Sequence, residues 1–438
     1  ANFDLNTGLC TLKEPEPDFI EKLQPVVEKA ISVAAATGLV ALLAGADPAL
    51  LWAFVNLLQT FYYLMFFNVE YTVNLVEFFR IFSLGGLTFL PRIDNIINFE
   101  SDLPKVESPP NFYNNQYTGL FLETAGVMVL FVASALIIYG IFMLIHVFQG
   151  GFSGRCTKTF NSIRNWFEWS PLLRGWISAY SELLYAGLLQ LRHLSYRDRI
   201  LAVSSMCGLI FTILNFLLPV LCFFIINQFH DKRIEVSKYR ALTEDYDVNI
   251  PIKRYFSVLS LSRRMIQCVA VVFLYYQPVL QITVPVLLNI VYLSCLIIYR
   301  PHHRTFNNFI NIFNEAGFLG LHSLIFLFAY DDTIQKFTRE MRKTIGDTII
   351  ILCLLIIAVE LGIIIYEQYS TYKSIYQSIK QWCVRKYAKK NKEKKCISNY
   401  KVMTRVKRER QSGRISRAST IRSRIPAPYL KRVAVSEL

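Results

Sequence analysis

The sequence is poor in charge and lacks the cysteine patterns of metal and disulfide sites. Only 18% of the 438 residues are charged, whereas 53% are hydrophobic. None of the nine cysteines forms a C-x-x-C pair, and five of them fall inside apolar runs, where a thiol behaves as a small hydrophobic group. These absences exclude a small disulfide-bonded or zinc-bound domain. We expect no metal and no cofactor.

The sequence motifs of soluble enzymes are also missing. There is no H-E-x-x-H, no G-x-S-x-G and no Walker loop, and the glycine-rich segment 150–154 follows no strand. We therefore predict that the protein is not an enzyme. Because membrane enzymes can scatter their catalytic residues, a membrane-embedded enzyme remains an alternative.

The net charge of +15 comes from one end of the chain. From Lys373 onward there are 20 Lys and Arg residues against three acidic ones, so the rest of the chain is close to neutral. A basic charge confined to a tail does not indicate a nucleic-acid-binding protein, and we expect no nucleic acid among the partners.

Long apolar runs are abundant, and about 20 such residues cross a bilayer. The sequence therefore predicts an all-α, polytopic transmembrane bundle of eight or nine spans. Residues 1–30 are expected to lie outside the membrane, residues 31–370 to form the transmembrane domain, and residues 371–438 to form a basic, largely disordered cytoplasmic tail. The eight spans are Pro48–Phe67, Leu120–Val147, Leu172–Leu191, Ile200–Asn227, Phe256–Tyr276, Pro278–Tyr299, Ile312–Tyr330 and Asp347–Tyr366.

The distribution of basic residues sets the expected topology, because short cytoplasmic loops carry the excess of Lys and Arg. The tail and the basic segment 149–174 both belong inside, which requires the rather polar segment Leu172–Leu191 to cross. Segment 68–118, with six acidic and three basic residues, then lies outside. Ile31–Ala46 is short for a span. It is either a ninth helix, which places the N-terminus outside, or a helix packed against the membrane.

Polar side chains recur on single faces of several predicted spans. Charged and amide groups are costly in hydrocarbon, so they face protein or water. They either line a hydrated pathway for an ion or a lipid headgroup, or hold helices together through hydrogen bonds. The pathway candidates are Glu182, Glu315, Glu360, Asn311, His322, Asn215 and Asn289. Arg263 and Arg264 are adjacent rather than three residues apart, so we expect them to extend toward the membrane surface instead of sensing voltage.

The tail contains a dense lysine cluster about 20 residues beyond the last predicted span. We expect the last helix to continue to about Cys383 and the chain beyond Lys401 to be disordered. The cluster predicts either contact with anionic lipid of the inner leaflet, at about 1 kcal/mol per basic residue near the surface, or a solvated tail that only sets the topology. The expected contact residues are Lys386, Lys389, Lys390, Lys394 and Lys395.

Several short motifs together resemble a known family. They are Asp47-Pro48-Ala49-Leu50-Leu51-Trp52, the segment from Trp176 to Tyr185, Tyr299-Arg300-Pro301 and Phe313-Asn314-Glu315. Their order is similar to the membrane region of TRP-like multipass proteins, which include the fungal flavin-carrier proteins and large multipass proteins of ciliated protozoa. The resemblance covers about residues 20–370. It implies nine spans, an outside N-terminus and a cation-channel-like or transport role. The loop 331–343 is short and charged, so no re-entrant selectivity filter is predicted there.

The leading functional prediction is a transport-type membrane protein, either a cation-permeable channel or a related ion or lipid pathway. The alternative is a receptor or membrane-anchoring module that carries an extracellular domain and does not transport. We expect a plasma-membrane location with a cytoplasmic C-terminus. The expected partners are membrane lipids, cations and further copies of the chain.

Overall fold

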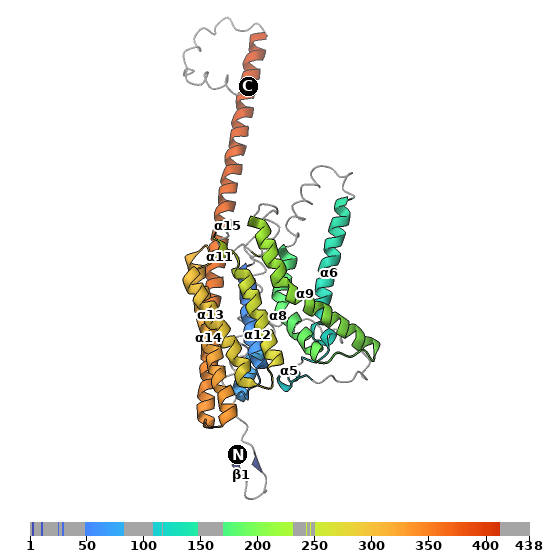
Figure 1. The fold of residues 1–438 in the computed structure, drawn as a ribbon. Helices are drawn as coiled ribbons and strands as arrows, with labels where there is room; N and C mark the ends of the chain where they lie inside the picture. The colour runs from blue at the N-terminus through green and yellow to red at the C-terminus, as the bar shows by residue number, and fades with distance from the viewer. Residues whose placement is uncertain are drawn as a thin grey trace. The chain divides into compact units, whose positions relative to one another are not determined.

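The structure is a computed structural model in which residues 2–3, 10–11, 25, 29, 49–82, 108–115, 117–147, 170–230, 242, 246 and 250–411 are described, apart from some side chains within the helices. It is dominated by helices (Figure 1). The first elements are a two-residue antiparallel pair, β1 (Asn2–Phe3) and β2 (Cys10–Thr11). The helices are α2 (Ala49–Tyr63), η1 (Leu64–Phe66), α3 (Val73–Arg80), α5 (Pro110–Tyr113), α6 (Phe121–Val147), α8 (Ser170–Arg192), α9 (Arg199–His230), α11 (Pro251–Arg254), α12 (Phe256–Phe273), α13 (Pro278–Tyr299), α14 (Thr305–Ile334) and α15 (Arg339–Gln411).

Five helical segments in the described part of the chain are long and apolar enough to cross a membrane. They are Arg199–Gln228, Phe256–Phe273, Pro278–Tyr299, Thr305–Ile334 and Arg339–Ser370. They overlap five of the predicted spans and confirm the helical membrane class. The other three predicted spans correspond to α2, α6 and α8, and their crossing of the membrane stays a prediction. The candidate ninth span, Ile31–Ala46, lies outside the described residues.

Helices α12, α13 and α14 form two consecutive hairpins. The turn from α12 to α13 is only four residues long, as the Gln277-Pro278 junction predicts, and proline stands at the first position of α13, where its missing N–H is not needed. The turn from α13 to α14 begins at Arg300, which adopts a left-handed backbone with φ of 42°. These short turns place the three helices side by side in the order of the chain.

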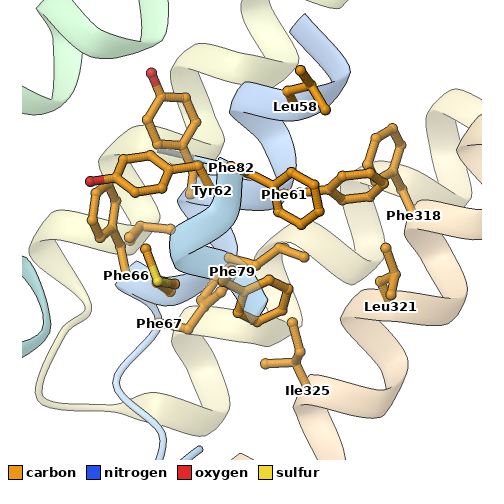
Figure 2. Packing of buried hydrophobic residues seen from close by; sticks show 14 of the residues in the cluster. Leu58, Phe61, Tyr62, Phe66, Phe67, Phe79, Phe82, Phe318, Leu321 and Ile325 are labelled. Atoms are coloured by element: carbon orange, nitrogen blue, oxygen red, sulfur yellow. The ribbon is translucent and has the colours of Figure 1, made fainter. Parts of the chain in front are cut away.

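Aromatic side chains fill the centre of the bundle (Figure 2). Phe61 of α2 packs against Phe82 and against Phe318 of α14, with ring centroids 5.5 and 5.8 Å apart. Phe66 of η1 stacks on Phe112 of α5 at 4.5 Å. Lipid tails are as apolar as these side chains, so the rings stabilise the bundle through close van der Waals packing rather than through removal from water. Because these contacts join segments far apart in sequence, they hold the helices around the polar groups described below.

A proline inside α9 is compensated by a neighbouring helix. Pro219 cannot donate a backbone hydrogen bond, so the carbonyl of Asn215, four residues earlier, loses its usual partner. The hydroxyl of Tyr180 on α8 donates to this carbonyl at 3.3 Å. The hydrogen bond from Tyr180 therefore links α8 to α9 and satisfies the carbonyl that the proline leaves unpaired.

The chain divides into two compact units, Ala1–Tyr366 and Glu367–Leu438. Helix α15 contributes to both and continues to Gln411. The expectation of a largely disordered tail whose helix ends near Cys383 was therefore wrong for the residues up to Gln411. The segment has no residue that breaks a helix, since residues 363–411 contain no glycine and no proline. Residues 412–438 lie outside the described part.

Candidate functional site: a buried ion pair and its polar neighbours

The centre of the site is an ion pair between Arg263 of α12 and Glu315 of α14. The guanidinium donates to both carboxylate oxygens, with 2.8 Å between Nη2 and Oε1. The two side chains are only 13% and 10% exposed. The guanidinium also lies over the ring of Tyr292 on α13, 4.2 Å from its centroid. This two-pronged, stacked arrangement is specific to arginine and holds three helices together.

The polar network extends from the ion pair to His322 through one amide. Nη1 of Arg263 donates to Oδ1 of Asn289 on α13 at 3.2 Å, and Nδ2 of Asn289 lies 3.0 Å from Nδ1 of His322. The same Nδ1 is 2.8 Å from the carbonyl of Phe318. Since Nδ1 can serve only one of these contacts at a time, the position of the ring proton depends on which one forms.

His322 keeps one ring nitrogen without a partner. Its side chain is 1% exposed, and its Nε2 has no hydrogen-bond partner within the described part of the chain. A buried polar atom of this kind calls for a water molecule, an ion or a transported group as its partner. This nitrogen gives the network one free hydrogen-bonding position for a polar species.

Glu360 of α15 lies on the other side of α14. The side-chain amide of Asn314 donates to Oε1 of Glu360, and the Glu360 residue is 5% exposed. Since Asn314 and Glu315 are consecutive, α14 directs one toward α15 and the next toward α12. The Oδ1 of Asn314 has no partner among the described residues.

Glu182 of α8 forms a separate buried site. The hydroxyls of Tyr63 and Tyr117 both donate to its Oε2, at 2.9 and 2.5 Å. Tyr117 lies in the segment before α6. Burial raises the pKa of the Tyr117 hydroxyl well above that of a free tyrosine, and the adjacent carboxylate raises it further. The phenol therefore remains protonated and serves as a hydrogen-bond donor.

The remaining amide candidates make local or structural contacts. Asn215 accepts a hydrogen bond from Nε1 of Trp176 at 2.9 Å, which joins α9 to α8. The amide of Asn311 donates to the carbonyl of Asn307 within its own helix at 2.8 Å. The contacts thus bring Glu315, Asn289 and His322 together. They link neither Asn215, Asn311 nor Glu182 to this network.

The predicted position of Arg263 was wrong. We expected Arg263 to extend toward the membrane surface, and the structure instead buries it against a carboxylate 52 residues away. The available signal was an arginine and a glutamate inside two predicted spans, since ionisable groups within a membrane tend to pair. Its neighbour Arg264 donates to Oδ1 of Asn56 on α2 at 3.4 Å, which adds a contact to a fourth helix.

A second charged cluster lies at one end of the bundle. Arg342 of α15 donates to Asp331 and Asp332 at 2.9 and 2.7 Å and to the carbonyl of Glu70 at 2.6 Å. Asp332 also helps line a cavity of about 600 Å³, and the other polar lining residues are Asn68, Glu70, Arg80, Asn111, Asn114 and Asn115. This end of the bundle is polar and accessible.

Of the five lysines predicted to contact lipid, one has a described side chain. Lys386 is exposed and its Nζ lies 4.8 Å from the ring centroid of Trp382. Lys389, Lys390, Lys394 and Lys395 belong to α15, but their side chains lie outside the described part. Contact of this cluster with lipid stays a prediction.

The chain was compared with known protein families, proteins and structures. No protein-family model, curated protein or solved structure matches the chain. The resemblance to TRP-like multipass proteins therefore stays a prediction. The fold defines a class, a helical membrane protein, and the contacts pair an arginine with a glutamate among helices long and apolar enough to cross a membrane.

Proposed function

We propose that the protein is a transport-type multipass membrane protein and that the Arg263–Glu315 network belongs to its ion or lipid pathway. The observation that carries the proposal is the burial of this pair, with Asn289 and His322, among α12, α13 and α14. Ionisable groups at such positions are expensive and most often mark the route of a substrate or a proton. The unpartnered Nε2 of His322 supports the same function.

The proposed topology has eight crossings between α2 and α15, with Ile31–Ala46 as the ninth. It follows the distribution of basic residues and the family resemblance. The tail lies in the cytoplasm of a plasma-membrane protein, and its lysine cluster contacts anionic lipid. Attachment of a membrane-impermeant thiol reagent to single cysteines introduced at exposed Asn114 and exposed His303 tests this arrangement. We expect labelling from outside at the first position only, and the reverse pattern overturns the topology.

Flux through reconstituted protein tests the pathway. Glu315→Gln keeps the size of the side chain and removes its charge, so we expect the flux of cations, protons or fluorescent lipid to fall by tenfold or more. Glu77→Gln is the matched control, because Glu77 is half exposed and pairs with Arg80 of its own helix. Unchanged flux in Glu315→Gln, with the fold intact by circular dichroism, refutes the role of this site.

A second candidate function is membrane anchoring or reception without transport. The bonding of the three buried carboxylates favours it, since Glu182, Glu315 and Glu360 each have protein partners that suit a purely structural role. The same reconstitution separates the two functions. Absence of any flux from protein that retains its fold supports the anchoring module.

A further inference from the structure

The second unit of the chain carries an aromatic stripe with a regular spacing. On α15, Tyr369, Tyr372, Tyr376, Ile379 and Cys383 follow one another at intervals of three, four, three and four residues. We call these five residues the seam. An alternating spacing of three and four, averaging 3.5, is the pattern of the a and d positions in a coiled coil.

The seam has no partner within the described part of the chain. Tyr369 and Tyr376 are 66% and 68% exposed, Ile379 is 55% exposed and Tyr372 is 40% exposed. Trp382, next to the seam, is 59% exposed. The opposite face is polar and includes Gln377 and Gln381. An exposed apolar stripe of this size on a helix that continues beyond a candidate span marks an interaction surface.

We propose that the seam pairs in parallel with the seam of a second copy of this chain. The segment 363–411 has neither glycine nor proline, so it lacks the residues at which helices bend sharply. Helix α15 also contains a candidate span, Arg339–Ser370. Two copies inserted in the same membrane have the same orientation, so their α15 helices run in the same direction. The two seams can then pair in parallel.

The exposed area is sufficient for a specific contact. An aromatic side chain buries roughly 150–250 Å², so at the observed exposures the seam and Trp382 present on the order of 500 Å² on each helix and about 1,000 Å² in a pair. This reaches the lower end of specific interfaces, and the common membrane anchoring of both copies adds effective concentration.

The charges around the seam are compatible with two identical helices. In a parallel pair, Lys373 and Lys380 occupy e positions and lie beside g positions of the partner, which are residues 368 and 375. Those positions carry glutamine and isoleucine in the sequence, so no lysine faces a lysine there. The same register returns at Ile397 and Tyr400, which are 58% and 71% exposed. Between Cys383 and Ile397 the a and d positions carry Lys386, Lys390 and Glu393, so the apolar contact ends at the seam.

Cys383 is a built-in probe, because thiols at the same a position of two parallel helices lie close enough for a disulfide. The experiment uses the full chain in lipid vesicles with Cys383 as its single cysteine and a copper–phenanthroline oxidant. We expect cross-linked dimers to form at least tenfold faster than from Gln381→Cys in the same background without Cys383. Equal rates from the two positions overturn the proposal, because Gln381 lies on the outer face.

Disruption of the seam is the second measurement. Tyr376→Glu combined with Ile379→Glu is expected to abolish the Cys383 cross-link, whereas Gln377→Glu combined with Gln381→Glu leaves it unchanged. A cross-link that survives the seam variant overturns the proposal. If Cys383 does not cross-link and lipid-attached bromine quenches Trp382, the stripe packs on a membrane and the proposal is also overturned. The measurement does not depend on transport, so its result is independent of the proposed function.

Discussion

The strongest prediction concerns the Arg263–Glu315 pair and is designed as a double-mutant cycle. Glu315→Leu leaves the buried guanidinium of Arg263 without its carboxylate. Arg263→Leu leaves the buried carboxylate of Glu315 without its guanidinium. Removing one partner of a buried pair destabilises by about 3–5 kcal/mol, whereas replacing both by apolar groups is often close to neutral. We therefore expect each single variant to lose about 3–5 kcal/mol of stability and the double variant to lose less than either.

The structure supports this magnitude. The pair contains two charge-assisted hydrogen bonds, each contributing about 1.5–3 kcal/mol, and neither side chain is accessible enough for water to replace the missing partner. The free energy of unfolding is measured for all four proteins in detergent micelles by tryptophan fluorescence. The control is Glu77→Leu, which breaks an exposed pair worth about 0–1 kcal/mol. Single-variant losses below about 1 kcal/mol, or losses that simply add, refute the reasoning.

Two further stability predictions use the same unfolding assay. A Cβ atom on Gly187 would lie 2.2 Å from Oγ1 of Thr212, so Gly187→Ala is expected to cost about 1–3 kcal/mol by forcing α8 and α9 apart. Gly140→Ala is its control, because a Cβ there meets nothing within 4 Å, and equal effects of the two substitutions contradict the close packing. Tyr117→Phe removes one of two donors to buried Glu182 and is expected to cost about 1–3 kcal/mol. No measurable change in that variant shows that the hydrogen bond contributes nothing to stability.

The membrane class and most span positions were readable from the sequence because they depend on local composition. An apolar run of sufficient length forms a helix whose backbone hydrogen bonds are internal, whichever helices surround it. Five predicted spans, from Ile200–Asn227 to Asp347–Tyr366, overlap the five apolar helices of the structure. The boundary between the predicted spans Phe256–Tyr276 and Pro278–Tyr299 was equally readable, since proline suits the first position of a helix.

Only the tertiary structure decided which polar groups meet. Arg263 and Glu315 are 52 residues apart, and Glu182 binds hydroxyls 119 and 65 residues away. A sequence pattern shows that polar residues share a face of one helix, but the rotation of that helix against its neighbours follows from the packing of many side chains. That packing turned Arg263 inward and placed His322 within reach of Asn289. In the same helix as His322, the amide of Asn311 donates instead to a carbonyl of its own helix.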